Sequence, residues 1–376
     1  MSQGNQPHAM VQMAHGSGGG ATHRLIRDLF VRCLGNPILE QLNDAAVIAW
    51  VDLQGRGASA PRAEFPGAGV EASGVGSRAP GEGEAAKWRV AVTTDSFVVK
   101  PLFFRGGDIG RLAVCGTVND LAVCGALPRY LTLGMIIEEG FPLEQLERVV
   151  LSIRETCREA GVQVVTGDTK VVERGQADGL YINTTGVGMV PPGIQLGGER
   201  ARPGDAVLIS GTIGDHGMAV LSERAGISWE TSIESDCAPL NGLIQAILAV
   251  APDVRCFRDP TRGGLAATLN EIAAQSQAGI RVEEGAVPVS DAVRGACEML
   301  GFDPLYVANE GKMVAIVPEA RAGGILDVMR RHPYGRMAAR IGEVVREHPG
   351  MVTLRTGIGG ERILDMPEGE MLPRIC

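Results

Sequence analysis

A turn-rich stretch at Pro191–Pro203 divides this chain into two series of predicted strands and helices. Proline lacks a backbone N–H and cannot continue a helix or a central strand, so a segment with repeated prolines is typical of a domain boundary. With 376 residues, the chain is long enough to bury two hydrophobic cores. We therefore expect one domain at residues 1–195, a second at 196–358, and a mobile tail at 359–376.

The first half mixes strands and helices without strict alternation. Apolar residues at helical spacing predict helices at Thr22–Cys33, Gly106–Gly125 and Pro142–Ala160. Apolar runs bounded by turns predict strands at Asp44–Val51, Trp88–Thr94, Tyr130–Glu138, Val162–Thr166 and Leu180–Val190. This order favours an α+β domain over a doubly wound parallel sheet. Residues 54–87, rich in Gly, Ala, Ser, Pro and Arg, predict a disordered insertion between two paired strands.

The second half is also mixed. Strands are predicted at Ala206–Ser210, Met313–Val317 and Ala338–Val344, and helices are predicted near Gly217, Leu240, Gly264 and Ala292. Beyond residue 359, Pro367, Gly369 and Pro373 disfavour a helix, so an extended tail is expected there.

Charge and hydrophobicity exclude two classes of partner. The net charge of −9 and the pI near 5.3 leave no basic stripe that could neutralise a phosphodiester backbone, so nucleic acid is not expected as a partner. No apolar run reaches the length of a membrane span, and Met1–His8 lacks the apolar core of a signal peptide. We expect a cytoplasmic protein that does not bind membranes.

One of the eight cysteines stands apart from the others. No C-x-x-C pair is present, and seven cysteines lie in apolar or helical contexts typical of buried free thiols. Cys376 instead ends the predicted tail, where a thiol is exposed and oxidisable. A flexible segment of about ten residues reaches roughly 30 Å when extended, so Cys376 could carry a covalent adduct between two sites.

A glycine-rich segment precedes the first predicted helix. In His15–Gly20, the bare backbone amides of Gly16, Ser17, Gly18 and Gly19 could bind a phosphate at the start of that helix. The segment is not a P-loop, because no Gly-Lys-Ser/Thr follows it. From the residues alone, phosphate binding and a plain flexible turn remain equally open.

Four aspartates occur at the ends of predicted strands or in turns: Asp44, Asp95, Asp120 and Asp168. A carboxylate in apolar surroundings is unfavourable unless it is paired or bound to a metal, so the set indicates a shared cation. Mg²⁺ is the expected ion, because hard cations prefer carboxylate oxygens and bridge polyphosphates. The alternative is that each aspartate caps a helix or closes a turn.

Further polar residues are candidates for chemistry. Lys170 follows Asp168 and could supply a positive charge to a phosphate, or it could be an ordinary surface lysine. Glu310 precedes an apolar strand and could be a general base or a solvated turn residue. Arg262 and Asn119 could orient a nucleotide, or they could form an ion pair and pack a helix.

In this order, the motifs resemble the HypE family of hydrogenase maturation factors, which are carbamoyl dehydratases. The resemblance covers nearly the whole chain, and the terminal Pro373–Cys376 is its most specific part. The other segments that carry it are His15–Gly20, Thr93–Val99, Gly106–Pro128, Gly167–Val172, Asp215–Gly217, Asp259–Leu265 and Ala308–Lys312. It implies a two-domain fold like that of aminoimidazole ribonucleotide synthetase, ATP and Mg²⁺ bound at the first domain, and a homodimer formed through the first domains.

The resemblance also implies a reaction and partners. A carbamoyl group delivered by the carbamoyltransferase HypF would be attached to Cys376 and dehydrated with ATP to a thiocyanate. Cyanide would then pass to the HypC–HypD complex, for the metal centre of [NiFe] hydrogenases. The metal ligands would be Asp44, Asp95, Asp120 and Asp168. ATP would be bound by Gly16, Ser17, Gly18, Gly19, Asn119, Thr169 and Arg262. Catalysis would use Cys376, with Glu310 or Lys170 handling protons.

Two departures and two alternatives accompany this prediction. Arg105 stands where the family often has proline, and residues 54–87 exceed the usual loop, but neither touches a motif residue. One alternative is an ATP-dependent synthetase acting on a free small molecule. The other is a metallochaperone that binds iron or nickel through Cys376, which the six scattered histidines support poorly.

Overall fold

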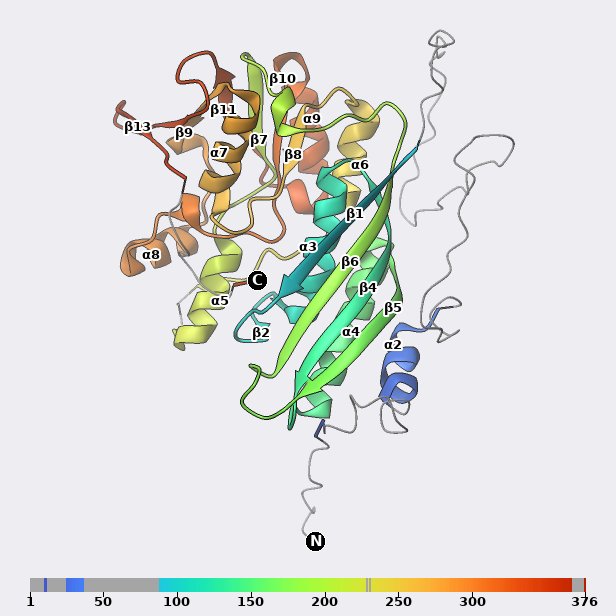
Figure 1. The fold of residues 1–376 in the computed structure, drawn as a ribbon. Helices are drawn as coiled ribbons and strands as arrows, with labels where there is room; N and C mark the ends of the chain where they lie inside the picture. Colours follow the sequence, from blue (N-terminus) through green and yellow to red (C-terminus); the bar gives the residue numbers. More distant parts are fainter. Residues whose placement is uncertain (1–9, 12–24, 37–87, 228, 230, 367–374) are drawn as a thin grey trace, which may run out of the picture.

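The structure is a computed structural model, and it describes residues 10–11, 25–36, 88–227, 229, 231–366 and 375–376. Within these residues, the chain forms a four-stranded and a seven-stranded sheet, which belong to the two halves of the sequence (Figure 1). Residues 375–376 lie between the two halves, close to α5 (Asp215–Ala225) and β2 (Phe103–Phe104) (Figure 1).

The four-stranded sheet belongs to the first domain and has the order β1-β6-β4-β5. β6 pairs antiparallel with both β1 and β4, whereas β4 and β5 are parallel. The strands are β1 (Arg89–Phe97), β4 (Leu127–Glu138), β5 (Gln163–Val172) and β6 (Leu180–Val190), with a short hairpin of β2 (Phe103–Phe104) and β3 (Gly107–Asp108).

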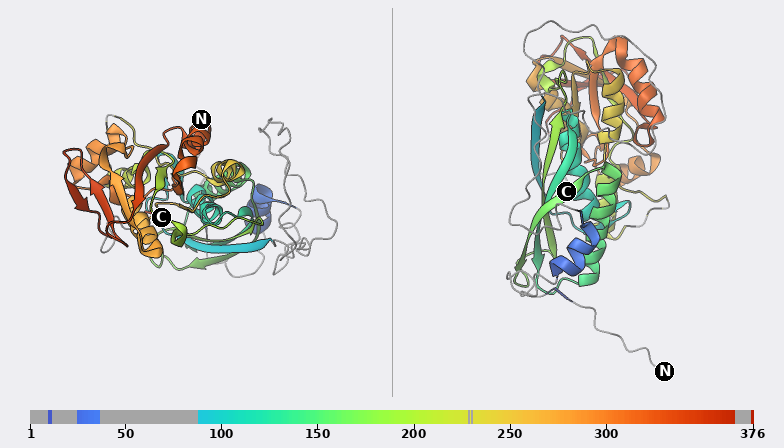
Figure 2. Two further views of the ribbon diagram at one scale, coloured as in Figure 1. Left: turned by 90° about the horizontal axis from the view of Figure 1, so that it is seen from above. Right: turned by 90° about the vertical axis from the view of Figure 1, so that its right-hand side faces the viewer.

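Two helices cover one face of this sheet, as the right-hand view of Figure 2 shows. α3 (Ile109–Val123) is almost wholly buried, because the sheet lies on one side and the second domain on the other. Asp108 caps its start by accepting hydrogen bonds from the Gly110 and Arg111 amides. α4 (Leu143–Ala160) is amphipathic and ends at Gly161, whose φ of 70° suits glycine. Helices η2 (Ile26–Val31) and α2 (Arg32–Leu34) pack on α4.

No described element covers the other face of the sheet. Its side chains are partly apolar: Val92 is 63% exposed and Ile136 is 44% exposed. Val90 on β1 is also exposed, so apolar groups reach both an edge and the centre of this face. A partly apolar sheet face of this kind is suited to a protein interface.

The seven-stranded sheet carries the second domain and is buried on both faces. In β7 every residue is buried: Ala206 and Leu208 face one hydrophobic cluster, and Val207 and Ile209 face another. The order is β13-β12-β9-β11-β7-β10-β8. The strands are β7 (Asp205–Ile209), β8 (Cys256–Arg258), β9 (Gly279–Glu283), β10 (Val314–Pro318), β11 (Ala339–Val345), β12 (Val352–Arg355) and β13 (Glu361–Ile363).

Helices lie on both faces of the second sheet. α6 and α9 contribute to one hydrophobic cluster, and α7 contributes to the other. The longer helices are α5 (Asp215–Ala225), α6 (Asn241–Val250), α7 (Gly264–Ser276), α8 (Asp291–Leu300) and α9 (Glu319–Arg331). Short 3₁₀ turns are η4 (Gly198–Arg200), η5 (Glu284–Ala286), η6 (Pro304–Tyr306) and η7 (Pro333–Gly335).

The predicted fold class, a two-domain mixed α+β protein, is confirmed. β6 has the predicted bounds, whereas β5 runs six residues beyond the predicted Thr166. Residues 361–363 were predicted in the tail, but they form β13 against β12, and Leu364 after them is fully buried. These residues therefore belong to the second domain. The predictions for 44–51 and 54–87 lie outside the described residues.

Candidate functional site

Acidic side chains from both domains gather where β1 and α3 meet the second domain. Asp95 lies on β1 and Asp120 on α3. The second domain contributes Asp236, Asp259 and Glu310, which lie in connecting segments. Their charges act on one another: Asp95 and Asp120 both raise the pKa of Asp259. We call these five residues the acidic cluster.

Burial raises the pKa of Asp95, Asp120, Asp259 and Glu310, and repulsion from neighbouring carboxylates adds to this for the last three. Burial, and next the charge of Asp120, raise the pKa of Asp259 to about 7. Burial raises the pKa of Glu310 well above its ordinary value, and the charges of Asp259 and Asp236 add to this. Glu310 is only 3% exposed, and its Oε1 has no hydrogen-bond partner among the described residues. The cluster therefore holds proton acceptors that are strengthened by burial.

Three cations offset part of the negative charge. Lys312 Nζ lies 3.1 Å from Asp236 Oδ2, and the Asp236 side chain is only 2% exposed. Burial raises the pKa of Asp95, but the Ser96 amide and the charge of Arg262 pull it in the opposite direction. The charge of Arg258 likewise opposes the raised pKa of Asp120 and Asp259.

A close backbone contact fixes Glu310 in the acidic cluster. The Glu310 amide donates to Asp236 Oδ1 at 3.0 Å. A Cβ on the next residue, Gly311, would lie 1.8 Å from the Asp236 carbonyl oxygen, so only glycine allows this approach. Glu310 is thereby held against the segment that carries Asp236.

A cavity of about 350 Å³ opens beside the acidic cluster. Thr93 Oγ1 donates to Asp120 Oδ2 at 2.9 Å on its wall. Its other polar lining includes Asp259, Arg258, Thr261 and Arg262. Guanidinium groups bind phosphate oxygens well, so the predicted role of Arg262 in binding a nucleotide is compatible with its position.

The structure does not bring all the predicted site residues together in one chain. Asp168 and Lys170 lie on β5, at the edge of the sheet opposite β1, about 14 Å away if each strand spacing is about 4.8 Å. Their side chains are 70% and 65% exposed and pair with each other at 3.0 Å. Thr169 lies between them. Within one chain, this group is therefore separate from Asp95 and Asp120.

Asn119 joins α3 to the second domain. Its buried Nδ2 donates to the carbonyl oxygens of Ala238 (3.1 Å) and Glu310 (3.3 Å), and its Oδ1 accepts from the Leu240 amide (2.7 Å). Both amide protons are used by backbone groups of the second domain. These bonds support the helix-packing alternative for Asn119, and its contact with ATP stays a prediction.

Five predicted residues lie outside the described part of the chain: Gly16, Ser17, Gly18, Gly19 and Asp44. Among the residues that the structure describes, no group of three His, Cys, Asp or Glu side chains is arranged to hold one metal ion. The described part of the chain also has no helix that is long and apolar enough to cross a membrane.

The C-terminal residues dock between the two domains. Ile375 is 4% exposed and belongs to the same hydrophobic cluster as Phe97 and Cys237. The backbone amide of Val98 donates to the main-chain oxygen of Cys376 at 3.2 Å. Val98 is three residues past Asp95, and Cys237 follows Asp236. Cys376, which packs on this cluster, is thus held next to segments that carry acidic side chains.

His216 contacts the docked C-terminus directly. It is the second residue of α5 and is completely buried. Its Nε2 lies 2.9 Å from the Ile375 carbonyl oxygen, and its Nδ1 lies 2.8 Å from Ser235 Oγ. Burial lowers the pKa of His216, so the ring is neutral near pH 7.

Sequence reasoning missed three of these residues. Asp259 directly follows the short strand β8 and begins one of the segments that carry the family resemblance, so its position after a strand could have identified it as a site residue. His216 also lies in one of these segments, but nothing in the sequence indicates its partner more than 150 residues away. Asp236 lies in an irregular segment and carries no recognisable pattern.

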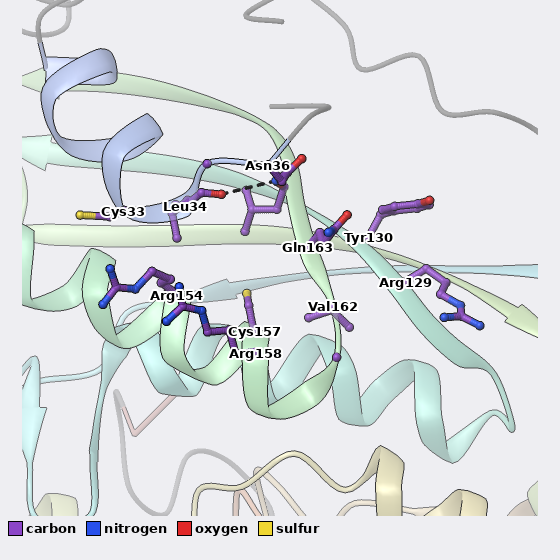
Figure 3. A pocket seen from close by; sticks show the side chains of 13 residues that line it. Cys33, Leu34, Asn36, Arg129, Tyr130, Arg154, Cys157, Arg158, Val162 and Gln163 are labelled. Carbon is purple, nitrogen blue, oxygen red and sulfur yellow. Dashed lines mark hydrogen bonds between the residues drawn. The ribbon is translucent and has the colours of Figure 1, made fainter. Parts of the chain in front are cut away.

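A second cavity, of about 540 Å³, lies between α2, α4 and the start of β5 (Figure 3). Asn36 Nδ2 donates to the Val164 carbonyl oxygen at 2.7 Å and joins the helical segment to the sheet. Figure 3 shows Arg129 pointing away from Arg154 and Arg158. A binding site needs polar groups that converge on a ligand, so we assign no function to this cavity.

The two halves of the chain match the two domains of one class of protein. Residues 82–190 match the family described as AIR synthase related protein, N-terminal domain, and residues 202–354 match its C-terminal domain. With an acidic cluster and a cavity at the junction of these domains, the fold and the site define a two-domain AIR synthase-related protein.

Closer similarity narrows this class to one family. The carbamoyl dehydratase HypE of Azotobacter vinelandii is 52% identical over 100% of both chains. The crystal structure of hydrogenase maturation protein HypE in complex with ATP is 48% identical, with a TM-score of 0.85 over 97% of this chain and 99% of that one. A HypE–HypF complex matches with 44% identity and a TM-score of 0.73 over 91% and 99%. The chain belongs to the HypE family of carbamoyl dehydratases, which are hydrogenase maturation proteins.

Proposed function

We propose that this protein uses ATP to dehydrate a carbamoyl group carried on Cys376, leaving a thiocyanate that supplies cyanide ligands to [NiFe] hydrogenase. The docked C-terminus carries the proposal. Ile375 is buried, and Val98 and His216 hold the backbone on either side of the thiol-bearing residue, next to the acidic cluster. The name of the Azotobacter vinelandii relative supports the same reaction.

ATP would bind in the cavity beside the acidic cluster. The similar HypE structure contains ATP, which supports a nucleotide here. Arg258 and Arg262 line the cavity and offer guanidinium donors to phosphate oxygens. The proposal keeps Thr169 and the amides of Gly16, Ser17, Gly18 and Gly19 as further phosphate contacts.

Mg²⁺ would be held by carboxylates of the acidic cluster and its neighbours. Burial raises the pKa values of Asp95 and Asp120, and the charge of Asp95 further raises that of Asp120. Such a set fits a hard divalent cation, because the cation favours the charged form of each carboxylate. Asp44 and Asp168 complete the proposed ligands. When bound, the ion would neutralise the charge that develops on the transferred phosphoryl group.

The chemistry must remove the carbamoyl oxygen, which is a poor leaving group. In the proposed sequence this oxygen attacks the γ-phosphorus of ATP, so an O–P bond forms and ADP leaves. The C–O bond then breaks and phosphate departs with the former carbamoyl oxygen. Both N–H protons are lost to the base and the phosphate, and S–C≡N remains on Cys376. One carbamoyl group and one ATP thus give thiocyanate, ADP and phosphate.

Glu310 is the stronger of the two proposed bases. It is buried, its Oε1 has no partner in the described part of the chain, and its raised pKa makes it a better proton acceptor than an exposed carboxylate. Lys170 is exposed on β5 in a single chain and pairs with Asp168. A role for Lys170 therefore depends on a second copy of the chain.

A homodimer through the open sheet face would supply that second copy. Val92 and Ile136 expose apolar surface there. A twofold axis parallel to the strands places β5 of one copy opposite β1 of the other, because the two strands are opposite edges of the sheet. Asp168 and Lys170 of one copy would then lie over the strand that carries Asp95 in the other.

HypF and the HypC–HypD complex are the proposed partners. The similar HypE–HypF structure supports HypF as the source of the carbamoyl group. Cys376 must leave its docked position to reach a partner, and the dozen residues after Leu364 span roughly 40 Å when extended. HypC–HypD would receive the cyanide.

Intact-protein mass spectrometry tests the proposed reaction. The full chain is incubated with HypF, carbamoyl phosphate and ATP, beside a Cys376→Ala variant. A carbamoyl adduct on Cys376 that loses one water only with hydrolysable ATP is the expected result. If no adduct formed on Cys376 while ATP was consumed with a free substrate, a small-molecule synthetase would replace this proposal. Iron or nickel bound through Cys376 without ATP turnover would indicate a metallochaperone.

A further inference from the structure

We propose that His216 is the positioning residue for the docked C-terminus: its Nε2–H holds the Ile375 carbonyl and thereby places Cys376 for reaction. This rests on the proposed function, in which Cys376 carries the reacting group. His216 touches the backbone next to Cys376 and acts through that backbone.

The hydrogen bonds around His216 define its tautomer. The Ile375 carbonyl oxygen can only accept, so Nε2 must carry the proton. In the neutral ring Nδ1 is then the acceptor, and the Ser235 hydroxyl donates to it at 2.8 Å. Ser235 Oγ in turn accepts from the Cys237 amide at 3.1 Å. An ordered series of donors and acceptors therefore runs from the Cys237 amide to the C-terminus.

The same segment carries part of the acidic cluster. Asp236 lies between Ser235 and Cys237, and its carboxylate accepts from the Glu310 amide. The backbone of Ser235 is fixed from the other side, because its amide donates to the Arg105 carbonyl oxygen at 2.8 Å. His216 thus sets the position of Cys376 relative to Asp236 and Glu310.

Packing restricts the His216 ring and makes the docked state favourable. The Phe104 ring meets the imidazole edge-on, with centroids 5.4 Å apart and an interplanar angle of 88°. When the C-terminus leaves, the buried Nε2–H loses its hydrogen bond to the Ile375 carbonyl oxygen. Ile375 also loses its apolar surroundings, since it is 4% exposed when docked. Docking therefore has a polar part at His216 and an apolar part at Ile375.

Thiol labelling measures docking without requiring the reaction. The full chain is treated with iodoacetamide, and the label on Cys376 is quantified by mass spectrometry after proteolytic cleavage on the C-terminal side of Glu370. We expect His216→Leu to label Cys376 roughly five- to tenfold faster than the natural chain, the effect of losing one buried hydrogen bond. His216→Gln keeps an N–H donor and is expected to restore most of the protection.

Controls separate positioning from a general loss of structure. Label on Cys256 and Cys297, which are buried in hydrophobic clusters that do not contain the C-terminus, is read in the same samples and should not change. His332→Leu, which removes a histidine that accepts a local hydrogen bond far from the tail, should behave like the natural chain. Equal acceleration at all three cysteines, or an equal effect of His216→Gln and His216→Leu, would overturn the proposal.

Ile375→Ala tests the same docking from the tail and leaves α5 intact. It should also accelerate labelling of Cys376, and unchanged labelling in this variant would overturn the proposal even if His216→Leu failed to fold. No carbamoyl donor or ATP is needed in these measurements. A failure of the dehydration reaction is therefore distinguishable from a failure of the positioning role.

Discussion

Neutralising one carboxylate of the acidic cluster should make the protein less sensitive to alkaline pH. In Asp259→Asn the side chain keeps its size but cannot ionise. Burial and the charge of Asp120 raise the pKa of Asp259 from its ordinary 3.8 to about 7. The folded state therefore binds a proton that the unfolded state releases, and the stability from this proton is full below pH 4 and lost as pH rises through 7.

The size of the effect follows from this pKa difference. One pKa unit corresponds to about 1.4 kcal/mol of unfolding free energy. Between pH 5 and pH 7 the folded state keeps the Asp259 proton that the unfolded state has lost, so raising the pH from 5 to 8 lowers the free energy of unfolding by about 2.5 kcal/mol through Asp259 alone. In Asp259→Asn this loss disappears. The remaining carboxylates also repel one another less, because Asp259 contributes to the raised pKa of Glu310.

Urea denaturation at pH 5 and pH 8 without divalent ions measures the effect. The natural chain should lose about 2.5 kcal/mol more unfolding free energy over this interval than Asp259→Asn. Added Mg²⁺ at pH 8 should stabilise the natural chain more than the variant, because the ion relieves the same repulsion. Equal pH dependence in both chains would refute the account of the acidic cluster.

Three further predictions concern contacts near the site. Gly311→Ala should lower the free energy of unfolding by about 2–3 kcal/mol in chemical denaturation and reduce ATP turnover, because its Cβ would clash with the backbone of Asp236. The control Gly323→Ala, at an open position of a helix, should do neither. Asn119→Leu should cost about 3 kcal/mol, measured by the same denaturation, since three backbone groups lose their partner; an unchanged midpoint would contradict this role. Mixing inactive Lys170→Ala and Glu310→Gln chains in equal amounts should restore about a quarter of the activity if each site uses both copies, and no activity if it does not.

Local sequence patterns predicted several elements of the first domain, but not the short hairpin of β2 and β3 or the full length of β5. The bounds of β6 and the start of α4 after Pro142 follow from apolar spacing and proline placement. Asp95 and Asp120 were predicted at the ends of strands or in turns, whereas Asp95 lies within β1 and Asp120 lies within α3. The extra residues at the end of β1 and the unbroken helix direct both side chains towards the second domain.

The rest of the site depends on how the domains pack, which no local pattern encodes. Asp236 and Glu310 approach each other only because Gly311 allows two backbone segments to touch. Asn119 and Asp120 are adjacent in one motif, yet on a helix they point in different directions, one to the second domain and the other to the cavity. Adjacency in the sequence therefore does not give these two residues the same surroundings.

The segment from Ser235 to Cys237 faces both the acidic cluster and the docked C-terminus. Under the proposed function, a cation or nucleotide and the C-terminus would bind on either side of this one short segment, and any coupling between the two events would act on both by the same factor. With favourable coupling, a copy whose C-terminus is away at a partner would hold its nucleotide more weakly. The enzyme would consume little ATP while idle, and the arriving thiol would itself switch on turnover.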